Sequence, residues 1–372
     1  MASKLRLFTK RLALIIHITV TIAFLLSCLA PYLNPKDWWF ISFLGLIFPF
    51  LLLVIIFFLF FWIMVRFRFA FISLIALIIG WKSISVFFAF NKPHKFSYKR
   101  DAGTIRIATW NVARFIELKQ NNNKGSQTRL KMMELLKQQD ADILCLEEFF
   151  HSDNPLYYPN LDYIRKNLNY PYYYFSRDDD GDLHYYGSVI FSRFPIIDSG
   201  LVRYPRPTLP EALIYADIKF NNDTLRVYAT HLQSLQFKTA DYDRINQIRN
   251  PDDRIIDNSK TILSKMKRGI IYRSIHADIV KQIIGDSPYP FLLCGDFNDI
   301  PNSYTYFTVR SGLQDAFLEK GFGIGRTFYA LSPTLRIDYI FATAHFSILQ
   351  YNRLLKNYSD HYMILADVKL NK

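Results

Sequence analysis

Past residue 100, several short apolar runs end in a polar residue that could bind a metal ion or move a proton. Eight residues share this position: Asn111, Glu148, His231, Asp296, Asn298, Asp338, Asp360 and His361. No cysteine pair or histidine pair at the spacing of a zinc site accompanies them in the sequence. Carboxylate and amide oxygens are the ligands that Mg²⁺ and Mn²⁺ prefer. The pattern therefore predicts a site for a hard divalent cation with imidazoles beside it.

The runs that deliver these residues have the composition of β-strands. They are rich in β-branched and aromatic residues, are separated by turn residues, and include TIRIATW, YGSVIFS, TLRVYATHL, FLLCGDFND and MILADVKL. Between them, residues 126–139 and 261–284 have the apolar spacing of amphipathic helices. Strands that outnumber helices favour an α+β sandwich with the helices on the outside. Because side chains alternate along a strand, Glu147 is expected to point away from Glu148 and to be structural.

Seven motifs, taken in chain order, resemble one family of enzymes. They are TWN, CLEEF, GSVIFSRFPI, THLQS, GDFND, RIDYIF and SDH. This set resembles the endonuclease/exonuclease/phosphatase superfamily over residues 104–370. The resemblance implies a four-layered α/β/β/α sandwich with the active site at one end of two facing sheets. It also implies hydrolysis of phosphoester bonds, of phosphodiesterase, nuclease or phosphatase type, with nucleic acid, phospholipid or sugar phosphate as the substrate; no protein partner is predicted.

The resemblance also indicates which residues would bind the divalent cation. Glu148 would be the main ligand of Mg²⁺ or Mn²⁺, with Asn111 and Asp360 near it. The cation would neutralise a non-bridging phosphate oxygen and stabilise the oxygen that leaves.

The remaining residues receive roles in catalysis and substrate binding from the same resemblance. Asp296 would orient or deprotonate the attacking water, and Asn298, two positions on and so on the same side of a strand, would hold that water or the phosphate. His361 would donate a hydrogen bond to the transition state or act as a base, while Asp338 would fix its tautomer and favour the imidazolium. His231 would bind a phosphate oxygen or protonate the leaving group, and both roles stay open.

A second interpretation is a catalytically silent, membrane-anchored binding or scaffold module with the same fold. Such a protein is expected to have lost at least one catalytic residue. The positions that would reveal this loss all keep the residue of the motif: Glu148, Asp296, Asn298, Asp338, Asp360 and His361. The sequence therefore favours an enzyme.

Residues 1–92 have the composition of a membrane region. Three apolar segments lie at about 12–30, 38–65 and 69–90. A helix of roughly 20 apolar residues is long enough to cross a bilayer. The chain is therefore expected to be an integral, multi-pass membrane protein whose helices contact the lipid bilayer, with residues 101–372 as its catalytic domain.

The charges follow the same division. Residues 1–100 hold twelve Lys and Arg and one acid, Asp37, so they carry +11 of the formal net charge of +13. Residues 101–372 carry the remaining +2, which argues against strong binding of duplex DNA. An odd number of spans after a basic N-terminus favours an extracytoplasmic catalytic domain.

The link between the THLQS and GDFND motifs is longer than in many members of this family. Its residues 238–285 include ten basic and six acidic side chains. The link could act as a lid over the active site, contact headgroups at a membrane surface, or form an ordinary outer helix preceded by a loop.

Overall fold

The structure is a computed structural model, and its described residues are 2–93, 95–122, 124–205, 211–235 and 255–371. The first part of the link discussed above, residues 238–254, therefore lies outside the described residues. The chain divides into two compact units. One comprises Met1–Phe88 and Ile300–Thr308, and the other comprises Ala89–Asp299 and Val309–Lys372.

The first unit is helical. Its elements are α1 (Ala2–Ser27), α2 (Pro35–Val65), the 3-10 turn η1 (Phe67–Phe69), α3 (Ala70–Ile79) and α4 (Trp81–Phe87). Leu7–Ser27 and Pro35–Val65 are each long and apolar enough to cross a membrane. Phe67–Ile79 and Trp81–Phe87 would do so together, but they are bent by 64°. The described residues thus provide two possible spans, or three if the bent pair is one span.

The bend divides the predicted apolar segment 69–90 into two helices. It lies at Gly80, between α3 and α4. A Cβ added to Gly80 would lie 2.7 Å from the ring of Phe24. The glycine therefore allows the chain to pass close to an aromatic side chain of α1, a contact that hydropathy alone does not reveal.

A buried polar network joins three helices of this unit. Trp62 donates its indole N–H to His17 Nδ1 at 3.0 Å, and His17 Nε2 lies 2.8 Å from the hydroxyl oxygen of Ser73. Because Nδ1 accepts, a neutral His17 carries its proton on Nε2 and donates it to Ser73. His17 thus links α1 with α2 and α3.

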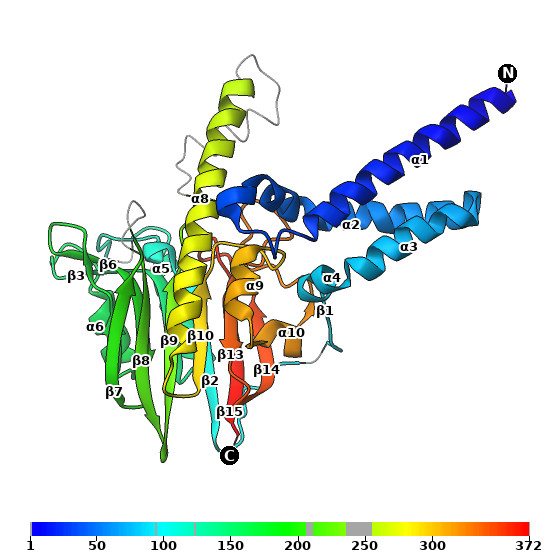
Figure 1. The fold of residues 1–372 in the computed structure, drawn as a ribbon. Helices are drawn as coiled ribbons and strands as arrows, with labels where there is room; N and C mark the ends of the chain where they lie inside the picture. The colour runs from blue at the N-terminus through cyan, green and yellow to red at the C-terminus, as the bar shows by residue number, and fades with distance from the viewer. Residues whose placement is uncertain (1, 94, 123, 206–210, 236–254, 372) are drawn as a thin grey trace. The chain divides into compact units, whose positions relative to one another are not determined.

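Besides a two-stranded sheet of β1 (Ala89–Phe90) and β12 (Phe322–Gly323), the second unit contains two large β-sheets (Figure 1). The seven-stranded sheet has the order β14 (Phe346–Leu354), β15 (Met363–Leu370), β2 (Thr104–Asn111), β3 (Ile143–Ser152), β6 (His184–Ser192) and β4 (Tyr172–Phe175), with β5 (Asp178–Asp179) also paired to β6. The six-stranded sheet has the order β11 (Gln314–Asp315), β13 (Asp338–Ala342), β10 (Phe291–Asp296), β9 (Asp223–His231), β8 (Ala212–Phe220) and β7 (Ile196–Arg203).

These sheets form the inner two of four layers. Apolar side chains of both sheets share one core, to which Cys145 contributes from one sheet and Cys294 from the other. A second cluster lies on the outer face of the seven-stranded sheet, under α5 (Thr128–Gln139) and α6 (Asn160–Asn167). The helix α8 (Ile255–Gly285) runs along the six-stranded sheet (Figure 1). This arrangement is the predicted α/β/β/α sandwich.

Each sheet has one parallel pair of strands at its centre. β2 runs parallel to β3, with α5 between them in the chain, and β9 runs parallel to β10, with α8 between them. From edge to edge, both sheets repeat the pattern antiparallel, antiparallel, parallel, antiparallel, antiparallel. Because parallel strands end at the same edge, Asn111 lies beside Glu147, and His231 lies beside Asp296.

A buried ion pair joins the strands β2 and β15. Arg106 donates from Nε and from a terminal nitrogen to the two carboxylate oxygens of Asp367, at 2.7 and 2.9 Å. The side chains of Arg106 and Asp367 are 0% and 2% exposed. Replacing Asp367 with alanine would leave a buried guanidinium without its counter-charge.

We expect Asp367→Ala to lower the free energy of unfolding by about 3–5 kcal/mol, because an unpaired buried charge is costly. Thermal unfolding of the full chain in detergent, followed by circular dichroism, measures the effect. Asp223→Ala removes an exposed aspartate of β9 and is the matched control. A shift no larger than that of the control would show that the pair contributes little.

Candidate active site

Glu148 lies at a bulge in β3. The pairing of β3 with β6 shifts register between Leu146 and Phe149, and Glu148 has a φ of +49°. A bulge redirects side chains and a left-handed φ is unfavourable for a residue with a Cβ, so this conformation is held by the surrounding sheet. Glu147 is fully buried and accepts a hydrogen bond from the Thr109 hydroxyl at 2.8 Å, whereas the Glu148 side chain is 31% exposed. Glu147 thus has the structural position that was expected.

Asn111 connects carboxylates from both sheets. Its amide nitrogen lies 3.2 Å from Glu148 Oε1 and 3.1 Å from Asp296 Oδ2. Its amide oxygen accepts from the backbone N–H of Ala113 at 3.0 Å, which fixes the orientation of the group. Two carboxylate oxygens therefore converge on the end of β2.

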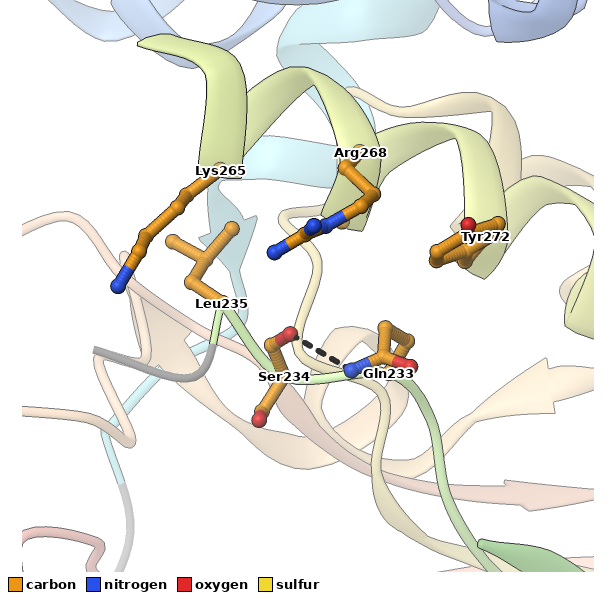
Figure 2. A pocket seen from close by; sticks show the side chains of 7 residues that line it. Gln233, Ser234, Leu235, Lys265, Arg268 and Tyr272 are labelled. Carbon is orange, nitrogen blue, oxygen red and sulfur yellow. Dashed lines mark hydrogen bonds between the residues drawn. The ribbon is translucent and has the colours of Figure 1, made fainter. Parts of the chain in front are cut away.

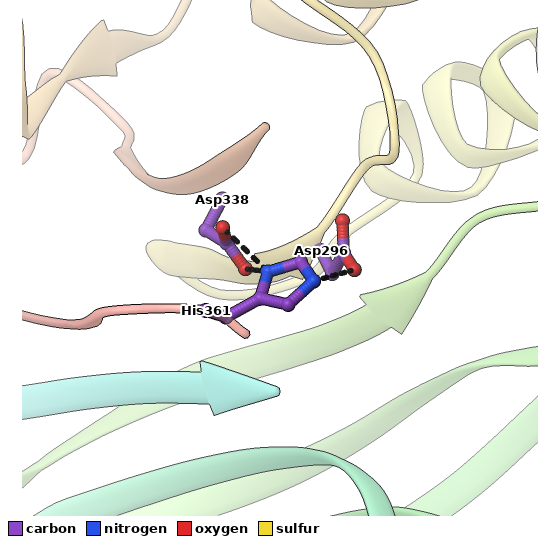
Figure 3. Close-up of side chains that lie close together, drawn as sticks. All are labelled: Asp296, Asp338 and His361. Carbon is purple, nitrogen blue, oxygen red and sulfur yellow. Dashed lines mark hydrogen bonds and ion pairs between the residues drawn. The ribbon is translucent and has the colours of Figure 1, made fainter. Parts of the chain in front are cut away.

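A short array of two carboxylates and an imidazole lies next to this point (Figure 3). Asp338 places its oxygens 3.0 and 3.1 Å from His361 Nδ1, and Asp296 Oδ2 lies 3.6 Å from His361 Nε2. Burial alone would lower the pKa of His361, but Asp338 and Asp296 outweigh it and raise the pKa well above its usual value. Burial raises the pKa of Asp296 to about 6 despite the opposing effect of His361. The arrangement thus favours the imidazolium form of His361.

His231 lies against the same carboxylates. Its Nε2 is 3.7 Å from Asp296 Oδ2 and 3.9 Å from Glu148 Oε1. Burial opposes its charged form, but the nearby carboxylates, Glu211 first among them, raise the pKa of His231. Both imidazoles therefore point a nitrogen at Asp296.

Glu211 is a site residue that the sequence analysis missed. Its Oε1 lies 4.0 Å from His231 Nδ1, on the side of the ring away from Asp296. Glu211 is buried, and burial raises its pKa to about 7. It faces Nδ1 of His231 as Asp338 faces Nδ1 of His361, but at 4.0 Å it is too far for a hydrogen bond. The letters PEALIY that contain it carry no motif, so only the tertiary structure reveals it.

Asn298 and Asp360 complete the predicted set. β10 ends at Asp296 and Asn298 has a φ of +52°, so the alternation expected of a continuing strand does not hold there. Instead, the Asn298 side chain donates to the backbone oxygen of Leu232 at 3.0 Å, and its backbone N–H donates to Asp296 Oδ1 at 2.8 Å. The hydroxyl of Ser359 lies 3.2 Å from Asp360 Oδ1 and 2.7 Å from the backbone oxygen of Asn111. Both residues thus lie beside the strand ends that carry the site.

Gly295 keeps the two central strands of the six-stranded sheet together next to the site. Its φ is +140°, and an added Cβ would lie 1.9 Å from the backbone oxygen of Thr230. A residue with a Cβ would therefore push β10 away from β9 and displace Asp296 from His231.

The donor atoms of this edge fit a hard divalent cation. One candidate group consists of Asp296, Asp338 and His361, whose ligand atoms lie within 4.8 Å of one another. From the other sheet, the Asn111 amide nitrogen contacts both Asp296 Oδ2 and Glu148 Oε1, so Glu148 lies next to this group. The described site therefore offers carboxylate, amide and imidazole donors, with no thiol among them, a set that suits a divalent cation.

The fold and these residues define an α+β sandwich with a carboxylate and imidazole site at one end of its central strands. The model of the Endonuclease/Exonuclease/phosphatase family matches residues 108–361. The chain belongs to this family, whose members are metal-dependent phosphoesterases and nucleases. The resemblance seen in the sequence motifs is thereby confirmed.

Solved structures show the same fold at low sequence identity. An endonuclease/exonuclease/phosphatase from Beutenbergia cavernae has 18% identity and a TM-score of 0.52, over 72% of this chain and 72% of that one. A family protein from Bacteroides thetaiotaomicron has 16% identity and a TM-score of 0.50, over 72% of this chain and 98% of that one. A second model, Domain of unknown function (DUF8431), matches residues 10–87. No curated protein matches the chain.

Proposed function

We propose that this protein is a membrane-anchored phosphoesterase that uses Mg²⁺ or Mn²⁺. The observation that carries the proposal is the contact of Asn111 with both Glu148 and Asp296, beside the array of Asp338 and His361. It brings oxygen donors and two imidazoles into one site from separate sheets. The intact set of residues argues against a silent scaffold with the same fold.

Glu148 and Asp360 would hold the cation in this proposal, and Asn111 would join them with its amide oxygen turned toward the site in place of its contact with Ala113. When bound, the cation supplies positive charge to a non-bridging phosphate oxygen and to the oxygen that leaves. Glu148 suits this role because its carboxylate is 31% exposed and its Oε1 contacts Asn111 at the site.

Asp296 and Asn298 would position the attacking water. Asp296 lies between the imidazoles of His231 and His361. Its carboxylate can accept a proton from the attacking water, and the two rings are close enough to stabilise its negative charge. The backbone N–H of Asn298 holds one Asp296 oxygen at 2.8 Å, which leaves Oδ2 facing Asn111 and the imidazoles. Asn298 itself would hold the water or a phosphate oxygen through its side chain.

The two imidazoles would bind the phosphate and move protons. His361, charged and oriented by Asp338, would donate a hydrogen bond to the oxygens that gain charge in the transition state. His231, with Glu211 behind it, would bind a phosphate oxygen or protonate the leaving group.

Hydrolysis by the full chain in detergent tests the function. The panel would hold supercoiled DNA, RNA, sphingomyelin, phosphatidylinositol phosphates and bis-p-nitrophenyl phosphate, each with Mg²⁺, Mn²⁺ or EDTA. Metal-dependent turnover of one class would establish the phosphoesterase and name its substrate. Folded protein that turns over none of them would overturn the proposal for these substrates and favour the scaffold.

We further propose that the catalytic domain lies outside the cytoplasm. The three native cysteines are buried, so an introduced one can be labelled selectively. Asn222 is exposed in the turn between β8 and β9. We expect Asn222→Cys to react with a membrane-impermeant maleimide in intact cells as fully as in lysed cells. Labelling that requires lysis would place the domain in the cytoplasm.

A further inference from the structure

A pocket lies beside the active site, between the chain that follows β9 and one face of α8 (Figure 2). Its residues are Gln233, Ser234, Leu235, Lys265, Arg268, Gly269 and Tyr272. The four residues from α8 recur at helical spacing and so share one face of the helix. A cavity of about 160 Å³ holds roughly five waters at about 30 Å³ each, which is enough for one small polar group and less than a drug-sized ligand needs.

Two cations give this pocket its charge. Lys265 is half-buried and Arg268 is exposed on the same face of α8. Among the described residues, none that lines the pocket is acidic. Tyr272 adds a hydroxyl group. This combination of guanidinium, ammonium and hydroxyl donors suits a phosphate group, which offers several oxygens to bidentate and single donors.

Gln233 adds a second requirement for the ligand, namely a hydrogen-bond donor. It is 3% exposed, its amide nitrogen donates to the backbone oxygen of Ser234 at 3.1 Å, and its Oε1 has no hydrogen-bond partner among the described residues. A buried acceptor without a partner is costly, so a ligand that donates a hydrogen bond would be favoured there. The oxygens of a phosphate ester accept, so a ligand that also satisfies Gln233 needs a separate donor, and a hydroxyl group next to the phosphate supplies one.

Arg273 connects the pocket with the segment of the GDFND motif, which ends at Asp299. It is buried, donates to the backbone oxygen of Gln233 at 3.1 Å, and has its Nε 3.4 Å from Asp299 Oδ2. Gln233 follows His231 by two residues, which span at most about 7 Å of chain. A group in the pocket could therefore belong to the same small molecule as a phosphoryl group at His231.

We propose that this pocket is a second binding site that receives a phosphate group carried next to a free hydroxyl, as in a phosphorylated polyol. The substrate would then carry this phosphate in addition to the one that is cleaved. That substrate role rests on the proposed phosphoesterase function, whereas the binding site itself does not. The polyol can be a soluble sugar phosphate or the headgroup of a lipid, because the chemistry of the two is the same.

Binding in EDTA tests the site without turnover. Isothermal titration of the full chain in detergent would use glycerol 3-phosphate, inorganic phosphate and short-chain phosphatidylinositol 4-phosphate as probes. We expect both polyol phosphates to bind more tightly than inorganic phosphate. The tighter of the two identifies a soluble or a lipid source. Since no metal or hydrolysis is needed, the result is independent of whether the enzyme activity is found.

Three variants make the test specific. Arg268→Gln and Lys265→Gln are each expected to weaken binding of the polyol phosphates roughly tenfold, because each removes a charge-assisted hydrogen bond. Gln233→Met is expected to abolish the preference over inorganic phosphate while leaving phosphate binding in place. Lys260→Gln removes an exposed lysine of α8 outside the pocket and should bind like the native chain. Absence of binding, or equal binding by all these variants, would overturn the proposal.

Discussion

Replacing His361 with alanine is expected to lower kcat by about 10²–10⁴-fold, the range of general acid and base catalysis by a positioned side chain. The ring lies between Asp338 and Asp296, and these carboxylates favour its charged form. A charged imidazole stabilises an oxygen that gains negative charge on the way to the transition state, so the loss falls on kcat more than on KM. Steady-state kinetics with the best substrate of the panel, at saturating Mg²⁺, measure both constants.

A matched control shows whether the fall in kcat is specific to His361 or follows from replacing any histidine. His345 is exposed in the turn between β13 and β14, and His345→Ala should retain native kinetics. Asp338→Asn keeps the shape of the pair but removes the charge that holds the imidazolium, and it should reduce kcat by less than His361→Ala does. A kcat for His361→Ala within tenfold of the native value would contradict the role given to this histidine.

Glu148→Gln is expected to lower kcat/KM by roughly two to three orders of magnitude at millimolar Mg²⁺, because a lost metal ligand costs several kcal/mol of transition-state stabilisation. Glutamine keeps the size of the side chain and one oxygen donor but removes its negative charge. The Mg²⁺ concentration at half-maximal rate should therefore rise, and titration calorimetry should show weaker Mg²⁺ binding. Glu134→Gln, an exposed change on α5, is the control.

The same titration distinguishes two sets of metal ligands. If Glu148 holds the cation, its variant needs more Mg²⁺, as stated above. If the group of Asp296, Asp338 and His361 holds it instead, Glu148→Gln would leave the Mg²⁺ requirement at the native value. That outcome would contradict the assignment of Glu148.

The sequence predicted the strand ends well because the chemistry there is local. Buried runs such as FLLCGD end abruptly in polar residues, and this change of residue type marks the end of the strand even though Asp296 itself is buried. The pairs Asp296 with His231 and Asn111 with Glu147 follow from the parallel registers. The four-layered sandwich was predicted through the family resemblance, whereas the strand pattern by itself indicated an α+β sandwich.

Other features depend on tertiary contacts that no local pattern encodes. The bulge that separates Glu147 from Glu148 is a register shift between β3 and β6, so it depends on both strands. Asn298 leaves the strand because its side chain and backbone are both held by other parts of the site. Glu211 reaches His231 from the position just before β8, the strand that pairs with β9, and the sequence does not specify that pairing.

The two large sheets share one order of strand directions, so the chain could be reconnected to build each of them from one continuous segment. β14, β15, β2, β3, β6 and β4 correspond in order to β7, β8, β9, β10, β13 and β11. The first of these sets is split, because β14 and β15 come from the end of the chain. Lys369 in β15 pairs with Thr104 in β2, so the ends of the domain are neighbours. In a circular permutant that joins these ends and opens between β13 and β14, each sheet becomes a contiguous half of the chain, as in a tandem duplication of one ancestral segment.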